Sequence, residues 1–140
     1  MIRHAGLIAL RRNGRWEGAL IEGPSGAGKS GLALRALTEG FRLVADDRVL
    51  VWASGGALYG RAPPALAGLI EARGLDVLPE AAIAFARIVL AVEHGDGERM
   101  PEPKTAELCG LAVPHLTLCL SDPAAPAKLR RAMGRLGTRT

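Results

Sequence analysis

Long apolar runs are missing from this sequence, and so is the layout of a secretory signal. The longest apolar run, residues 81–92, is too short to span a bilayer and contains Arg87. Residues 1–4 lead directly into an alternating pattern, with no charged segment followed by an apolar stretch. We therefore predict a cytoplasmic protein with no membrane partner.

Cysteine is also scarce, which argues against a disulfide framework. The two cysteines, Cys109 and Cys119, lack CxxC spacing and lie among apolar residues. We predict buried free thiols there, rather than a disulfide or a metal site.

Acidic residues are absent from the last thirteen positions, which hold five basic residues. These are Lys128, Arg130, Arg131, Arg135 and Arg139. Their five positive charges exceed the net charge of the whole chain, which is +4, so the rest of the chain has a net charge near −1. A nucleic-acid surface needs a broad basic patch with aromatic residues between the cations, and the tail has none. We predict no nucleic-acid partner, and a basic helix at about residues 126–137 whose charges are solvated or dock an acidic partner.

Residues 1–140 suit one domain in which strands predominate. The predicted strands are residues 5–10, 16–21, 42–45, 49–53, 57–61, 85–92 and 116–120. Asn13-Gly14 predicts a hairpin turn, apolar spacing predicts a helix over residues 29–37, and Gly40 ends it. Residues 62–74 are predicted to be irregular and residues 94–104 a polar loop. This pattern predicts an α/β fold with a mixed sheet around one phosphate-binding helix, not an alternating βαβ fold.

Residues 23–30 match the phosphate-binding pattern G-x-x-x-x-G-K-[ST] at every fixed position. They are Gly23, Pro24, Ser25, Gly26, Ala27, Gly28, Lys29 and Ser30. The glycines let backbone amides close around phosphate oxygens, and the following helix adds its positive end. Lys29 can neutralise the β and γ phosphates, and the Ser30 hydroxyl can bind Mg²⁺. A predicted strand enters and a helix leaves, so we prefer this interpretation to a simple glycine-rich turn.

The acidic pair Asp46-Asp47 follows the predicted strand over residues 42–45. Neighbouring side chains on an extended chain point to opposite faces, so one carboxylate can face a nucleotide while the protein holds the other. A carboxylate beside a γ-phosphate can orient a hydroxyl and take its proton. The alternative is an acidic turn between strands.

Glu71 and Arg73 flank Ala72 in an apolar segment bounded by glycines. Glu71 can hold a metal ion, and Arg73 can steady a phosphate or the acidic pair. A solvated surface pair is the alternative. His4 and Arg99 each have a surface interpretation as well, and His94 and His115 have no identifiable partner.

The order and spacing of these elements resemble the catalytic domain of the HPr kinase/phosphorylase family. The shared features are His4, residues 23–30, the phrase Leu-Val-Ala-Asp-Asp at residues 43–47, and Ile-Glu-Ala-Arg-Gly-Leu at residues 70–75. In the family's signature a valine stands where this chain has Ala72. The resemblance covers about residues 4–120 and implies a P-loop fold related to phosphoenolpyruvate carboxykinase.

The resemblance also implies an activity, namely ATP- and Mg²⁺-dependent phosphorylation of a serine on the phosphocarrier protein HPr. Asp47 resembles the general base, which becomes the acid in the reverse phosphorolysis. Ser30 and Glu71 resemble Mg²⁺ ligands. His4, Lys29 and Arg99 match the remaining active-site positions, while Asp46 and Arg73 support them.

Two departures from the family are visible. We expect the short alphaproteobacterial form of the family, which does not have the N-terminal domain of longer members. The family's Pro-x-Arg-Pro-Gly-Arg-Asn loop, tied to phosphorolysis, is replaced by the sequence of residues 120–128. We therefore expect the kinase reaction more than its reverse. The resemblance further implies a homo-oligomer, a hexamer in the family, whose C-terminal helix contacts the partner protein.

Two other functions stay open on sequence alone. The lost domain and altered loop suit an ATP-binding regulatory module with little or no catalysis. A small-molecule P-loop kinase would want an arginine-rich lid, for which only Arg99 and its loop qualify.

Overall fold

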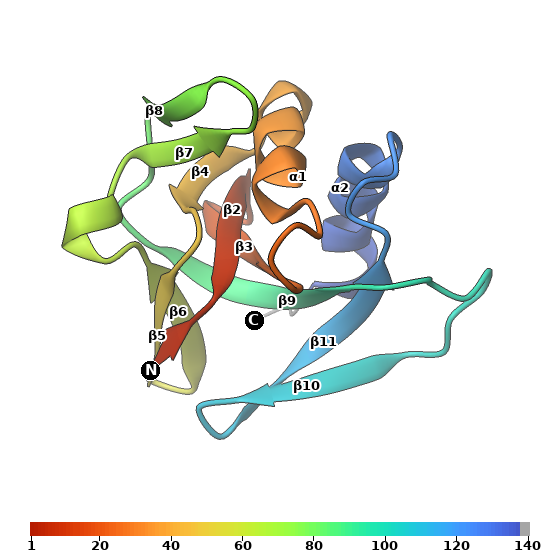
Figure 1. The fold of residues 1–140 in the computed structure, drawn as a ribbon. Helices are drawn as coiled ribbons and strands as arrows, with labels where there is room; N and C mark the ends of the chain where they lie inside the picture. The colour runs from red at the N-terminus through yellow and green to blue at the C-terminus, as the bar shows by residue number, and fades with distance from the viewer. Residues whose placement is uncertain (138–140) are drawn as a thin grey trace.

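The computed structural model describes residues 1–137 and shows a curved mixed sheet with two helices lying against one face (Figure 1). The strands are β1 (Ile2–Arg3), β2 (Ala5–Arg12), β3 (Arg15–Glu22), β4 (Arg42–Ala45), β5 (Val49–Ser54), β6 (Ala57–Arg61), β7 (Leu69–Ala72), β8 (Asp76–Pro79), β9 (Ala86–His94), β10 (Lys104–Leu108) and β11 (Leu111–Leu118). The helices are α1 (Lys29–Ala36) and α2 (Ala125–Leu136), with 3₁₀ turns η1 (Leu37–Glu39) and η2 (Pro64–Leu66). Within the described part of the chain, no helix is long and apolar enough to cross a membrane.

The main sheet is mixed in direction. Its strand order is β1-β5-β6-β9-β3-β2-β4, and β11 also pairs with β9 and carries β10 at its outer edge. β9 lies parallel to both β3 and β11, whereas the other pairs are antiparallel. The predicted mixed sheet is therefore confirmed, and the helix that begins at Lys29, α1, packs against it.

Two strands, β6 and β11, pair with the same edge of β9. β6 pairs with its first residues, with Gly60 opposite Ala86, and β11 pairs with its last residues, with Leu118 opposite His94. The end of β9 is thus enclosed between β3 and β11. This arrangement brings residues near His94 and those after β11 close to the loop that follows β3.

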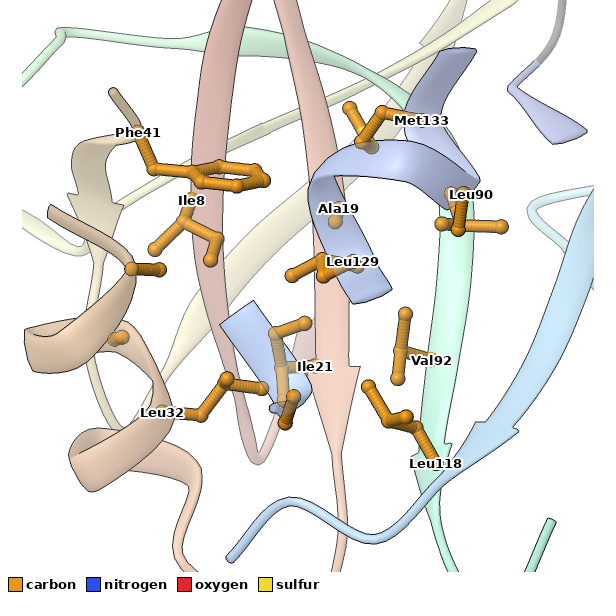
Figure 2. Close-up of a cluster of buried hydrophobic side chains, with 14 of the residues drawn as sticks. Ile8, Ala19, Ile21, Leu32, Phe41, Leu90, Val92, Leu118, Leu129 and Met133 are labelled. Carbon is orange, nitrogen blue, oxygen red and sulfur yellow. The ribbon is translucent and has the colours of Figure 1, made fainter. Parts of the chain in front are cut away.

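Both faces of the central strands are buried. Consecutive residues of these strands are apolar, and successive side chains point to opposite faces of the sheet. On β3, Ala19 and Ile21 pack toward the helices while Leu20 packs into the cluster on the other face. Figure 2 shows the helix-side cluster, in which Leu32 of α1 and Leu129 of α2 meet the sheet. Because side chains alternate in direction along these strands, one sheet contributes to two hydrophobic clusters, one on each face.

The β2–β3 hairpin anchors the far end of α2. Asn13 and Gly14 have φ of 53° and 73°, as a two-residue hairpin turn requires, so the predicted turn is confirmed. Arg12 donates to the carbonyl oxygen of Met133 at 2.6 Å and to the fully buried Glu17 carboxylate at 3.0 Å. The basic side chains of α2 that are described, Lys128, Arg130, Arg131 and Arg135, are exposed, and Arg139 lies outside the described residues.

Two regions differ from the sequence-based prediction. Residues 62–74, predicted as irregular, contain η2 and β7, and β7 pairs with the unpredicted β8. Each strand has only four residues, which is too short for a clear alternating pattern. The bounds of the predicted strand at residues 116–120 are also wrong, since that strand, β11, spans Leu111–Leu118 and pairs with the unpredicted β10. Pro114 inside β11 weakened the strand signal, and it is accommodated near the edge of the sheet.

The prediction of buried thiols is wrong as well. Cys109 is exposed and occupies the left-handed region, with φ of 51°, in the turn between β10 and β11. Cys119 is half-buried, just beyond β11. Both are free cysteines, as expected. Apolar neighbours in sequence did not predict burial here, because a turn directs Cys109 outward.

Candidate active site

The phosphate-binding pattern forms the connection between β3 and α1, which we call the Walker loop (residues 23–30). Gly26 and Gly28 have φ of 83° and 101°, a region that favours glycine. A β-carbon on Gly23 would lie only 2.9 Å from that of His94. Gly28 caps α1 and accepts a hydrogen bond from Leu32 N at 2.8 Å. The loop's glycines are therefore required by conformation at some positions and by close packing at another.

Lys29 turns back across the loop from the first position of α1. Its Nζ donates to the carbonyl oxygens of Gly23 at 2.6 Å and Pro24 at 3.3 Å. An ammonium group held by neutral carbonyls can exchange them for phosphate oxygens, which are stronger acceptors because they carry charge. Lys29 thus lies where it can take up a phosphate.

Asp46 is the centre of a polar cluster at the end of β4. The Ser30 hydroxyl lies 2.8 and 3.0 Å from its two carboxylate oxygens, and Glu71 N donates to Oδ2 at 2.9 Å. The Asp46 residue is only 6% exposed. Buried carboxylates require such hydrogen bonds. The cluster joins the Walker loop, β4 and β7.

Asp47 points away from that cluster and into solvent. It has φ of 71°, and its side chain is 68% exposed. Its nearest charged partner is Arg48, with Nε 3.7 Å from Oδ2, an exposed contact that adds little to stability. The two adjacent carboxylates therefore have distinct environments: Asp46 is held by the protein and Asp47 is accessible.

His4 lies beside the Asp47 turn. It falls between β1 and β2 and is exposed, and the next residue, Ala5, donates its N–H to the carbonyl oxygen of Asp47 at 3.2 Å. Ala5 is also opposite Glu22, the last residue of β3 before the Walker loop. Strand pairing thus brings His4, Asp47 and the start of the loop into one neighbourhood.

Glu71 and Arg73 share one side of the β7–β8 hairpin. Ile70 and Ala72 are buried, while Glu71 and Arg73 are exposed, as alternation along a strand predicts. The backbone of Glu71 is tied to Asp46, so the exposed carboxylate of Glu71 is on a segment fixed next to Ser30. Arg73 begins the turn toward β8.

Arg99 is not brought together with these groups. It lies in the connection between β9 and β10, which extends to one side of the molecule (Figure 1). It is exposed, and its side chain makes no hydrogen bond or ion pair with residues 1–137. Of the predicted site residues, Arg99 is the one with no structural link to the Walker loop.

His94 and Arg35 also touch this region, and sequence reasoning did not identify them. His94 Nδ1 accepts a hydrogen bond from Leu120 N at 3.2 Å, and Arg35 donates to the carbonyl oxygens of Leu120 and Asp122. Both act on a segment that follows β11. Only strand pairing places these residues together, so no short-range signal could have identified them.

The chain is similar to proteins named for one activity. Residues 6–90 match the model of the HPr Serine kinase C-terminal domain family. That range contains the Walker loop, Asp46, Asp47 and Glu71, and leaves out His4 and Arg99.

Curated relatives include "HPr kinase/phosphorylase" of Burkholderia cenocepacia (strain HI2424) and of Burkholderia multivorans (strain ATCC 17616 / 249). Each is 38% identical over 115 residues, an alignment that covers 72% of this chain and 36% of the relative. The chain therefore corresponds to about a third of the length of these relatives.

A solved structure has the same fold. The structure of the Hpr(Ser) kinase/phosphatase from Coxiella burnetii superposes with a TM-score of 0.80, covering 96% of this chain and 97% of that one, at 21% identity. The family match spans more than half of the chain and includes its Walker loop and acidic pair. This chain belongs to the HPr serine kinase C-terminal domain family.

Proposed function

We propose that this chain transfers the γ-phosphoryl group of ATP to a serine hydroxyl of HPr or an HPr-like phosphocarrier protein. The names of its relatives and the family's domain description support this activity. The observation that carries the proposal is the Ser30–Asp46 contact at 2.8 Å, which joins the last residue of the Walker loop to a buried carboxylate. The next residue, Asp47, has an accessible carboxylate. Phosphoryl transfer depends mainly on positioning and charge neutralisation, and these residues supply both.

The residues around Ser30 suit Mg²⁺. Among the described residues, no three His, Cys, Asp or Glu side chains cluster in a way that could enclose a metal. Mg²⁺ usually takes only one or two carboxylates and completes its shell with waters and phosphate oxygens. We assign the Ser30 hydroxyl and the Asp46 and Glu71 carboxylates to this ion. When bound, it would neutralise charge on the β and γ phosphates.

The remaining roles follow from accessibility. Asp47 accepts the proton of the incoming serine hydroxyl at a carboxylate oxygen, because its side chain is exposed, whereas Asp46 is buried against Ser30 and is assigned to the cation. Lys29 and the loop amides bind phosphate oxygens. His4 borders the Asp47 turn, and Arg73 and Arg99 would neutralise charge on the reacting groups, Arg99 after movement of its loop.

Several further properties accompany this proposal. The protein partner is an HPr-type carrier, the chain acts in the cytoplasm, and it assembles as a homo-oligomer, a hexamer in the family. The reverse phosphorolysis would use protonated Asp47 as the acid. Nucleic acid and membrane are not partners in this proposal.

The test is transfer of labelled phosphate. Wild-type protein, ATP, Mg²⁺ and HPr should yield phosphoserine at one mapped position. Asp47→Asn should lower the transfer rate by about 100-fold or more while the dissociation constant for ATP stays the same. Asp96→Asn, the same chemical change at an exposed carboxylate in the β9–β10 connection, is the matched control. Full transfer by Asp47→Asn would remove that residue from the chemistry, and phosphate on no protein would reject the kinase.

A second candidate is an ATP-binding regulatory module with little catalysis. The separation of Arg99 from the other groups favours it, since phosphoryl transfer needs cations around the reacting oxygens. Such a module would bind ATP, transfer nothing to HPr, and change the affinity of a partner in a pull-down with and without ATP.

A further inference from the structure

A turn that follows β11, residues 119–122, lies directly on the Walker loop. A β-carbon added to Gly28 would be 3.8 Å from Ser121 N and 3.9 Å from the β-carbon of Leu120. At the other end of the loop, a β-carbon on Gly23 would lie 3.7 Å from Leu120 Cδ1. Leu120 is fully buried. One turn therefore lies next to both the first and the last glycine of the phosphate-binding motif.

Hydrogen bonds from two sides fix this turn. His94, the last residue of β9, accepts the Leu120 N–H at Nδ1, 3.2 Å away. From α1, Arg35 donates to the carbonyl oxygens of Leu120 at 2.5 Å and Asp122 at 2.9 Å. The turn also closes on itself, with Asp122 N donating to the carbonyl oxygen of Cys119 at 3.1 Å.

Asp122 ties the end of the turn to α2. Its carboxylate accepts from Ala124 N at 2.9 Å and from Lys128 Nζ at 2.8 Å. The hydrogen bond from Lys128, followed by that from Ala124 N, lowers the pKa of the Asp122 carboxyl. The turn is thus bonded to β9, α1 and α2, and its inner side rests on the loop.

His94 has two contacts that converge on the loop. Its β-carbon packs so closely on Gly23 that an added methyl would approach it to 2.9 Å, and its ring holds the turn that rests on Gly28. To accept an N–H bond, Nδ1 must carry no proton, so the ring proton is on Nε2.

We propose that His94 is a positioning residue for the Walker loop. Together with Arg35 it holds residues 119–122 against Gly28, and so keeps the loop in the shape that receives the phosphates of a nucleotide. The inference rests on one part of the proposed function, which is that the Walker loop binds a nucleotide. His94 acts through the turn, and no direct contact with the nucleotide is required.

The test compares three substitutions at one position. Asparagine places an oxygen two bonds from Cβ, where histidine has Nδ1, so His94→Asn keeps an acceptor for Leu120 N. His94→Ala removes it, and His94→Gln keeps side-chain volume without an acceptor at that place. His115→Ala is the control: this half-buried histidine of β11 makes no side-chain hydrogen bond with residues 1–137.

Two readouts are measured on the full chain: amide hydrogen exchange of residues 23–30 and 119–122, and the dissociation constant for ATP with Mg²⁺. His94→Ala and His94→Gln should speed exchange in both segments and weaken ATP binding about five- to tenfold, the scale of one buried hydrogen bond. His94→Asn should return both values to within about twofold of wild type, and His115→Ala should match wild type.

Unchanged exchange of residues 23–30 in His94→Ala and His94→Gln would overturn the proposal. So would His94→Asn behaving like His94→Ala, because the acceptor would then be irrelevant. If wild-type protein binds no ATP, the proposed function fails, yet exchange still decides whether His94 positions the loop. The two failures are therefore distinguishable.

Discussion

The Ser30 hydroxyl donates to the Asp46 carboxylate, with oxygen distances of 2.8 and 3.0 Å across 16 residues of sequence. This contact links the hydroxyl that ends the Walker loop to the buried acid that directly follows β4. A cation bound by Ser30 would lie beside the negative charge of Asp46. The same carboxylate holds the backbone of Glu71, so one side chain organises both of the cation ligands predicted from sequence, Ser30 and Glu71.

Loss of either partner of this contact should uncouple ATP binding from Mg²⁺. Ser30→Ala removes a ligand and a donor, and Asp46→Asn removes the charge while keeping a similar shape. We expect each to reduce the Mg²⁺-dependent gain in ATP affinity by about tenfold or more, the range for groups that support a metal ligand. Calorimetry with Mg²⁺ and with a chelator measures the gain, and a wild-type gain in both variants would contradict the assignment.

Glu71 gives a separate test of the cation site, because its side chain is exposed and its structural contribution comes from the backbone. Glu71→Gln should leave the free energy of unfolding within about 0.5 kcal/mol of wild type. The Mg²⁺ concentration for half-maximal transfer should rise about tenfold. Glu107→Gln, an exposed glutamate on β10, should change neither value. An unchanged Mg²⁺ requirement would exclude Glu71 as a ligand.

Lys29→Met should remove most of the affinity for ATP with little effect on folding. The ammonium's present partners are two backbone carbonyls at 2.6 and 3.3 Å, and methionine retains the apolar stem. Loss of one charge-assisted contact to phosphate corresponds to about 1.5–3 kcal/mol, so the dissociation constant should rise about 10- to 100-fold. Titration with a fluorescent ATP analogue measures this. Lys104→Met on β10 is the control, and equal affinities for the two variants would argue against the role of Lys29.

One substitution, glycine to alanine, should have opposite effects at two positions. A methyl on Gly23 meets the β-carbons of His94 at 2.9 Å and Ala27 at 3.2 Å, so Gly23→Ala should destabilise the fold by about 1–3 kcal/mol. Gly31, inside α1, has open space around it, so Gly31→Ala should stabilise by about 0.5–1 kcal/mol through helix propensity. Denaturant unfolding measures both, and equal signs would contradict the packing described here.

Some features of the site are local in sequence, and these were predictable. The Walker loop needs glycines at positions of positive φ, followed by a lysine and a hydroxyl at the start of a helix, and all of them lie within eight residues. The Asn13-Gly14 turn is equally local. Motifs of this kind depend on backbone conformation, which nearby residues control.

The different environments of the Asp46 and Asp47 carboxylates were not predictable from local sequence. Alternation indicated that the two carboxylates diverge, but not which one meets Ser30. Asp47 adopts a left-handed conformation, its carbonyl oxygen accepts a hydrogen bond from Ala5 N, and its side chain is exposed. The donor of this hydrogen bond belongs to β2, which is far from Asp47 in sequence, so the different environments of Asp46 and Asp47 depend on tertiary structure.

By itself, the sequence determined the Walker loop, the main hairpin and the continuous apolar runs that bury both faces of the central strands, because each depends on neighbours along the chain. Tertiary structure alone decided that Asp46 is buried against Ser30, that the backbone of Glu71 joins them, and that His94 reaches the turn on Gly28. Those contacts join residues 16 to 26 positions apart, and they exist only once strand pairing has brought separate elements to the same end of the sheet.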